Sequence, residues 1–166
     1  MDVIEALRTR RSIRKYRKEP VTQAILEEIL DIARWSPSAG HSQPWEFITI
    51  TNPETKNKLS KSFMFGSFLD EAAAGIMIMA DTERTSCPLQ DGTLATYSIM
   101  LAAHGMGLGT CWINPSFFEA EVKSILGIPR EKQLICMLSI GYPDEKPDKP
   151  RLPLERMLHR ETYGGK

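Results

Sequence analysis

The order of helix-like and strand-like segments constrains the fold of this chain more than any other feature of its sequence. Apolar residues recur at helical spacing over residues 22–35, whereas residues 74–80 form a short apolar run that is typical of a buried strand. Helices and strands are intermixed in an irregular order, which predicts an α+β fold around one core and not a doubly wound α/β sheet. The expected elements are helices over 2–10 and 22–35, a strand over 45–51, a helix that begins at Pro53, a strand over 74–80, a helix over 90–104, a strand over 110–113, a helix between Ser116 and Gly127, and a strand over 134–142.

Polar residues at capping positions predict where four of these helices begin. Thr22 is the expected N-cap of the second helix, and Asn52 followed by Pro53 is the expected start of the third. Two further pairs have the spacing of a capping box. These pairs are Asp2 with Glu5, and Ser116 with Glu119.

The C-terminal residues differ in composition from the rest of the chain. Residues 143–153 contain four prolines and many charged residues, so we expect an extended connector followed by a short amphipathic tail. We therefore expect a single domain over residues 1–166, in which residues 143–166 form an extended C-terminal arm.

The charge balance argues against two classes of partner. Lysine plus arginine and aspartate plus glutamate number 21 each, so the chain lacks the basic excess of most nucleic-acid-binding proteins. No apolar run reaches the roughly 18 residues of a membrane span, and the acidic N-terminus does not resemble a signal peptide. We expect a cytoplasmic protein that binds neither nucleic acid nor membrane.

Cysteine and histidine residues are too scattered to suggest a metal site. Cys87, Cys111 and Cys136 are isolated, which argues against a zinc site and against a disulfide framework. The histidines at positions 41, 104 and 159 lack metal-ligand spacing, and we expect structural roles for His104 and His159. We therefore expect no bound metal.

Two short cationic segments stand out against the neutral net charge. Residues 10–14 are Arg-Arg-Ser-Ile-Arg, and residues 149–151 are Lys-Pro-Arg. Clustered cations on a neutral chain indicate a local anion, and the planar guanidinium group of arginine suits a phosphate. We interpret the two segments as halves of one phosphate site. The alternative for each segment alone is a solvated surface.

The segment from Trp35 to Trp45 is too rich in functional groups for a plain connector. It joins an expected helix to an expected strand, and it contains several serine, glycine and proline residues together with His41 and Gln43. Hydroxyl, amide and backbone N–H groups in such a loop suit the edge of a heteroaromatic ring. The alternative is a structural turn between two core tryptophans.

Two other motifs allow more than one interpretation. The glycine-rich residues 105–109 follow a helix and open a strand, which is the reverse of the Rossmann fingerprint, so we reject a dinucleotide-binding loop. These glycines favour a tight turn, and they would also let the backbone approach a flat ligand closely. The aromatic stretch over residues 63–68 suits either the core or an apolar substrate pocket.

Four of these motifs occur in the order found in one enzyme family. They are RRSIR at 10–14, SPSAGHSQPW at 36–45, GLGTCWI at 107–113, and SIGYP with KPRLPLE at 139–155. In this order they resemble the nitroreductase family of FMN-dependent oxidoreductases, and the resemblance spans nearly the whole chain. It implies a central, mostly antiparallel sheet flanked by helices, and an intertwined homodimer with FMN at the subunit interface.

The resemblance also implies roles for individual residues toward FMN. Arg10, Ser12, Lys149 and Arg151 would bind the phosphate group, and Arg11 would contribute through its backbone or side chain. Arg14 would approach the pyrimidine edge of the flavin, Pro37 and Ser38 would edge the ring, and Gly109 and Thr110 would lie near its N5 edge. The residues implied in FMN binding are Arg10, Arg11, Ser12, Arg14, Pro37, Ser38, His41, Gly109, Thr110, Lys149 and Arg151.

The chain departs from the family pattern in two respects. His41 stands where the family usually has an asparagine, and its bulkier, titratable ring offers one donor and one acceptor when neutral. The chain is also short, so we expect it to lack the helical insertion that covers the flavin in longer members.

The activity implied by the resemblance is the reduction of a small electron-poor acceptor by NAD(P)H. The acceptor would be a nitroaromatic, a quinone or a similar compound, and the reaction would be ping-pong, with the flavin carrying the hydride chemistry. Three alternatives stay open. They are another FMN-dependent reaction such as reductive dehalogenation or dehydrogenation, a non-catalytic flavin-binding module, and a cofactor-free interaction domain.

Overall fold

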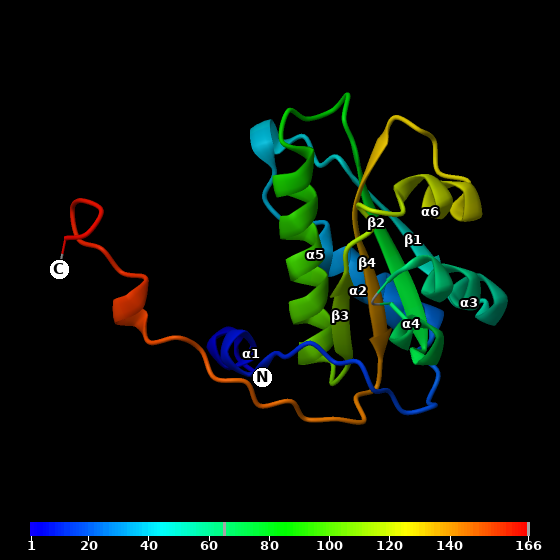
Figure 1. Cartoon of the computed structure of the whole chain (residues 1–166), viewed down its shortest axis with the longest axis horizontal. Helices are drawn as coiled ribbons and strands as arrows, with labels where there is room; N and C mark the ends of the chain where they lie inside the picture. The colour runs from blue at the N-terminus through cyan, green and yellow to red at the C-terminus, as the bar shows by residue number, and fades with distance from the viewer. Residues whose placement is uncertain (65, 166) are drawn as a thin grey trace.

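The computed structural model describes residues 1–64 and 66–165. Within these residues a four-stranded sheet has the order β1-β2-β4-β3, and every neighbouring pair of strands is antiparallel. The strands are β1 (Trp45–Ile50), β2 (Ala74–Asp81), β3 (Gly109–Ile113) and β4 (Lys132–Gly141). Helices flank this sheet (Figure 1), so the expected α+β fold with an antiparallel sheet is confirmed.

Helices cover both faces of the sheet. Ile76 and Ile78 of β2 belong to a core cluster shared with α2 and α5, whereas Met77 between them belongs to a second cluster shared with α3, α4 and α6. Since side chains alternate along a strand, β2 is buried on both faces, which explains its continuous apolar sequence. The helices are α1 (Val3–Thr9), α2 (Gln23–Ala33), α3 (Pro53–Ser62), α4 (Phe68–Glu71), α5 (Pro88–Gly105) and α6 (Glu119–Leu126).

Three of the four expected helix caps are confirmed. Asp2, Thr22 and Asn52 each accept a hydrogen bond from the backbone N–H three residues further along. The expected capping box at Ser116 is wrong. Asn114 Oδ1 accepts hydrogen bonds from both the backbone N–H and the hydroxyl of Ser116, at 3.0 and 2.6 Å, so α6 begins only at Glu119.

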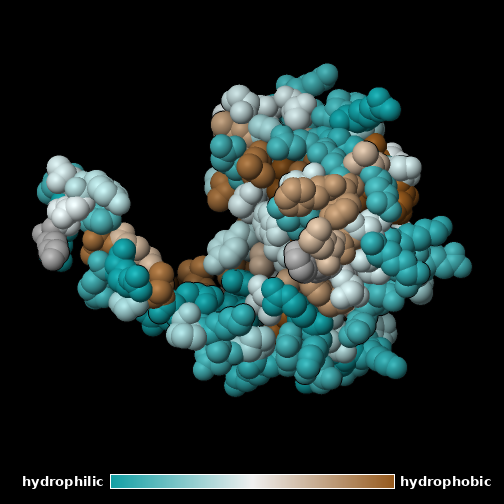
Figure 2. Space-filling view, in the orientation of Figure 1, coloured by the Kyte–Doolittle hydropathy of each residue, from teal (hydrophilic) through white to brown (hydrophobic). Residues whose placement is uncertain are grey.

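An extended N-terminal segment and a C-terminal arm lie outside these layers. After α1, the chain runs beside β3, and further on Tyr16 forms a bridge with Pro143, just beyond β4. The arm then leaves the body of the molecule, with a short 3-10 turn over Leu154–Arg156 (Figure 1). Figure 2 shows hydrophobic side chains along this arm. Its exposed large apolar residues are Leu152, Leu154, Met157, Leu158 and Tyr163.

Candidate functional site

The first cationic segment and the glycine-rich motif lie side by side. Ser12 pairs with Thr110 in a parallel bridge, and the backbone N–H of Ile13 donates to the carbonyl oxygen of Thr110 at 3.0 Å. A Cβ atom on Gly109 would lie 2.6 Å from Ile13 Cγ1, so glycine is needed for this close approach. The structure therefore brings together three of the residues expected to contact FMN, Ser12, Gly109 and Thr110.

Arg10 carries buried donors that no described residue satisfies. Its guanidinium carbon lies 5.9 Å from the centroid of the Tyr97 ring, and its Nε and Nη1 atoms are buried without a hydrogen-bond partner among the described residues. Arg11 Nε is also buried without a hydrogen-bond partner among the described residues. Arg11 Nη1, in contrast, donates to the carbonyl oxygens of Arg8 and Arg10 at 2.7 and 3.0 Å. Because unpaired buried donors are costly, this arrangement fits a bound anion such as a phosphate group.

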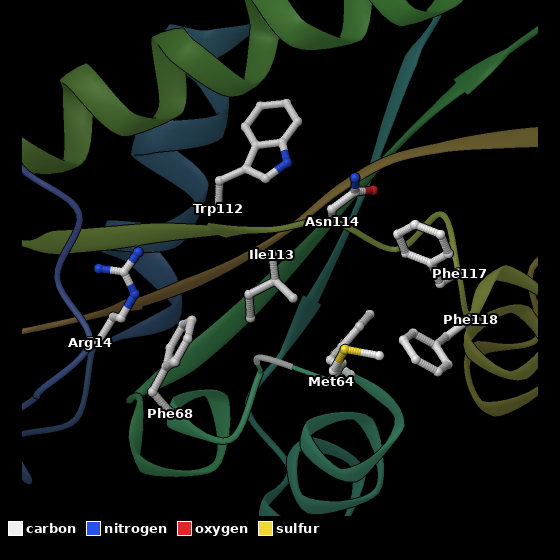
Figure 3. A pocket seen from close by; sticks show the side chains of 9 residues that line it. Arg14, Met64, Phe68, Trp112, Ile113, Asn114, Phe117 and Phe118 are labelled. Atoms are coloured by element: carbon white, nitrogen blue, oxygen red, sulfur yellow. The ribbon is translucent and has the colours of Figure 1, made fainter.

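A mainly aromatic cavity of about 440 Å³ opens beside Arg14. The guanidinium carbon of Arg14 lies 5.8 Å from the centroid of the Phe68 ring. Figure 3 shows Arg14 and Asn114 on different sides of the cavity, with aromatic and apolar side chains around it. The lining residues are Arg14, Phe63, Met64, Phe68, Trp112, Ile113, Asn114, Phe117 and Phe118.

Residues 63–68 were expected to belong either to the core or to an apolar substrate pocket. Phe63 is buried in the core cluster under α3 and also reaches the cavity, so the stretch serves both purposes; Phe65 lies outside the described residues. Sequence reasoning missed the contribution of Trp112, Asn114 and the two phenylalanines that follow. A signal was present, since all four lie within residues 112–118, close after Thr110 and Cys111 in the sequence.

The loop between α2 and β1 is fixed to α5 by buried polar contacts. Asp91 Oδ1 accepts a hydrogen bond from the backbone N–H of Ala39 at 2.9 Å, and the Ser36 and Ser98 hydroxyls lie 2.7 Å apart. His41 has a positive φ of 57°, which is uncommon outside glycine, and its Nε2 lies 3.0 Å from Gln43 Nε2. These contacts define the place of Pro37, Ser38 and His41 at the N-terminal end of α5 (Figure 1).

Within one chain, the expected site residues lie in three separate places. The first group, on residues 10–14 with Gly109 and Thr110, lies near α1 and the start of β3. The second group is the loop at the opposite end of α5. The third is Lys149 and Arg151 on the arm, both exposed, where Arg151 Nη1 donates to the carbonyl oxygen of Lys149 at 3.1 Å. Among the described residues, no hydrogen bond or ion pair links these groups.

Two titratable groups beside the first cationic segment have shifted pKa values. Burial lowers the pKa of His104, and the charge of Arg10 lowers it further. Burial raises the pKa of the Cys111 thiol, against the opposing effect of Arg14. Both shifts favour the neutral forms of these two side chains.

The sequence and the fold place the chain in a known family. The model of the Nitroreductase family matches residues 7–66 and 63–142, and the chain belongs to this family.

Relatives with assigned names and structures agree with this placement. A protein of Methanothermobacter thermautotrophicus, provisionally named NADH dehydrogenase/NAD(P)H nitroreductase, is 35% identical over 168 residues, which cover 94% of this chain and 88% of the relative. The structure of an FMN-dependent nitroreductase from Clostridium difficile has a TM-score of 0.88 at 32% identity, and the match covers 96% of this chain and 99% of that one. The NADPH:FMN oxidoreductase from Vibrio harveyi, solved in complex with NAD+, has a TM-score of 0.88 at 26% identity, and the match covers 96% of this chain but only 77% of that longer one.

Two further features of the described residues bear on the class of site. They contain no group of three or more histidine, cysteine, aspartate or glutamate side chains arranged to hold a metal ion. None of the helices in this part of the chain combines the length and the hydropathy needed to cross a membrane.

Proposed function

We propose that the protein is an FMN-dependent oxidoreductase that takes electrons from NAD(P)H and passes them to a small electron-poor acceptor. Family membership and the similarity to an FMN-dependent nitroreductase support this proposal. The observation that carries it is the pair of buried guanidinium nitrogens of Arg10 that have no partner among the described residues. These donors, next to Ser12, fit the phosphate group of FMN.

The cationic residues have two separate roles in this proposal. Arg10 and Ser12 would bind the phosphate group, with Arg11 beside them and with Lys149 and Arg151 supplied by an arm. When bound, FMN supplies the hydride-transfer chemistry.

Arg14 lies further along the segment, at the edge of the aromatic cavity. It would face the pyrimidine edge of the ring, where a fixed cation stabilises negative charge that develops during reduction. Gly109 and Thr110 lie beside Ser12 and Ile13, and they would bring backbone N–H groups close to the ring.

The arrangement of the other groups supports a homodimer. In one chain the loop with Pro37, Ser38 and His41 lies at the opposite end of α5 from α1 (Figure 1), so that loop would contact the FMN held by the partner's cationic segment. Exposed apolar side chains on α2, just after α2, on α5 and on the arm suit such an interface. They are Ile32, Trp35, Leu89, Leu94, Tyr97, Leu152, Leu154, Met157 and Leu158.

The aromatic cavity supports a site for the acceptor. Its lining offers ring faces for stacking, and Arg14 and Asn114 are its polar groups. A planar acceptor such as a nitroaromatic or a quinone would fit these surfaces. Because NAD(P)H and the acceptor would use the same face in turn, the kinetics would be ping-pong.

The test is a titration of the flavin-free protein with FMN, followed by anaerobic NADH or NADPH and then by an acceptor. The proposal expects a yellow complex, bleaching by the nicotinamide, and recovery of the absorbance with nitroaromatics or quinones. A protein that stays colourless with excess FMN contradicts the proposal. Bleaching without recovery by any acceptor would favour a different FMN-dependent reaction, and no bleaching would favour a non-catalytic flavin-binding module.

A further inference from the structure

The carboxylate of Glu145 connects the beginning of the C-terminal arm to the first cationic segment. Glu145 Oε1 accepts a hydrogen bond from the backbone N–H of Arg14 at 2.5 Å and one from the backbone N–H of Lys15 at 3.2 Å. One oxygen atom therefore holds two successive peptide groups of a segment that lies 130 residues away in the sequence.

A short antiparallel ladder leads up to this contact. The backbone N–H of Arg17 donates to the carbonyl oxygen of Tyr142, and that of Asp144 donates to the carbonyl oxygen of Lys15, both at 2.9 Å. Glu145 follows directly after this ladder, at the point where the chain turns outward as the arm. Its side chain thus extends the ladder by one step, to the peptide group of Arg14.

Attraction of a phosphate does not explain why a carboxylate lies here. Arg11 and Lys146 line the same cavity as Glu145, together with the acidic residues Glu5 and Asp148. Arg14 is a third nearby cation, since Glu145 accepts a hydrogen bond from its backbone N–H. A negative charge among these cations lowers the positive potential that attracts a phosphate. A carboxylate is, however, a strong acceptor for two adjacent N–H groups, and it fixes the backbone that carries them. The contribution of Glu145 is therefore geometric.

We propose that Glu145 is a positioning residue that holds the two cationic segments in register for the phosphate group of FMN. On one side it fixes the two peptide groups that flank Arg14, and on the other it lies at the root of the arm that bears Lys149 and Arg151. This inference rests on the proposed function, because it requires FMN to be the ligand. Glu145 touches neither the ring nor the phosphate in this proposal; it acts through the backbone.

The test compares the affinities of FMN and riboflavin, which share the ring but differ in the phosphate. Glu145→Ala leaves two backbone N–H groups without their acceptor, and we expect it to weaken FMN binding about tenfold or more. Riboflavin affinity should fall less than FMN affinity, because riboflavin depends on Arg14 at the ring edge but not on the phosphate contacts. Glu145→Gln keeps an acceptor oxygen without the charge, and it should restore most of the FMN affinity. Glu155→Ala, an exposed carboxylate on the same arm, is the matched control.

The possible outcomes separate three explanations. Tighter FMN binding in both Glu145→Ala and Glu145→Gln would show that charge and not position matters, and would overturn the inference. An equal loss of FMN and riboflavin affinity would indicate general structural damage and would also overturn it. If Glu145→Ala does not fold, Glu145→Asp provides the same comparison, since its shorter side chain cannot reach both N–H groups. Failure of the wild-type protein to bind FMN would contradict the proposed function itself.

Discussion

The carboxylate of Asp91, in the first turn of α5, accepts a hydrogen bond from the backbone N–H of Ala39, 52 residues away, at 2.9 Å. Its second oxygen accepts a hydrogen bond from the Thr85 hydroxyl at 2.6 Å, and the residue is only 2% exposed. Asp91 therefore fixes the loop that carries Pro37, Ser38 and His41 to the scaffold helix. Buried supports of this kind give a surface loop a defined position.

Asp91→Ala should destabilise the protein by about 1–3 kcal/mol, because the N–H of Ala39 and the hydroxyl of Thr85 lose a buried acceptor. Asp91→Asn keeps one acceptor oxygen and should cost less. Urea unfolding followed by circular dichroism measures both effects. Asp31→Ala is the control, since this exposed carboxylate makes only a surface ion pair with Arg34. Equal stability of Asp91→Ala and the wild type would contradict the support role.

Gly109→Ala should separate the first cationic segment from β3. The new Cβ would lie 2.6 Å from Ile13 Cγ1 and 2.7 Å from Ile13 Cβ, so one of the two backbones must shift. We expect a loss of about 1–3 kcal/mol in unfolding free energy, as for other overpacked sites, together with weaker FMN binding.

Gly105→Ala provides the matched control for this substitution. Gly105 is the last residue of α5, and a Cβ there would meet no atom within 4 Å. Alanine favours helices over glycine by roughly 0.5–1 kcal/mol, so this variant should be as stable as the wild type or slightly more stable. Equal stabilities of the two variants would show that the contact with Ile13 is not tight.

Arg10→Met should have opposite effects on stability and on ligand binding. The Nε and Nη1 atoms of Arg10 are buried without partners among the described residues, so the flavin-free protein should not lose stability when methionine replaces them. FMN binding should weaken about tenfold or more, because a charged hydrogen-bond donor to the phosphate is lost. Thermal melts with and without FMN measure both quantities.

Arg17→Met is the control, because the side chain of Arg17 makes only an exposed ion pair, with Glu19 at 3.7 Å. This control should bind FMN like the wild type. A flavin-free Arg10→Met protein that melts well below the wild type would show that Arg10 is satisfied by its stacking on Tyr97, and the argument for a bound anion would fail.

Helix caps and apolar patterns, which depend on residues close together in the sequence, predicted most of the fold. The caps at Asp2, Thr22 and Asn52 form because each side chain bonds to its own helix, so only nearby residues matter. The run over β2 reads as a buried strand because both of its faces are covered. Ser116 does not cap α6 because a nearby acceptor, Asn114 Oδ1, binds both its backbone N–H and its hydroxyl.

The supports of the candidate site could not be predicted in this way. Asp91 and Glu145 act on peptide groups 52 and about 130 residues away, and neither contact leaves a periodic pattern in the sequence. The cavity beside Arg14 likewise needs the ends of β3 and of α3 to meet, which only the sheet order decides. The cationic segments were visible because charge stands out on a neutral chain.

Arg151→Ala should weaken FMN binding about tenfold or more, since charged hydrogen bonds typically contribute about 1.5–3 kcal/mol. The remaining affinity should depend less on salt than in the wild type, because one screened charge contact is gone. Isothermal titration at two ionic strengths measures both effects. Arg156→Ala, exposed on the same arm, is the control. Unchanged FMN affinity in Arg151→Ala would remove the second cationic segment from the phosphate site.

His104 should make the stability of the flavin-free protein depend on pH below about 6.5. Burial lowers the pKa of His104 in the folded state, with Arg10 and Arg11 acting in the same direction and Glu5 opposing them. The unfolded chain therefore binds a proton at a higher pH than the folded protein does, so stability falls as the pH drops below the ordinary histidine value of about 6.5. His104→Gln removes this titration but keeps a polar partner for the Thr9 hydroxyl, which lies 2.8 Å from Nε2. Melting temperatures between pH 5 and 8 should slope less in His104→Gln than in the wild type. Parallel slopes for His104→Gln and the wild type would contradict the lowered pKa of His104 in the folded protein.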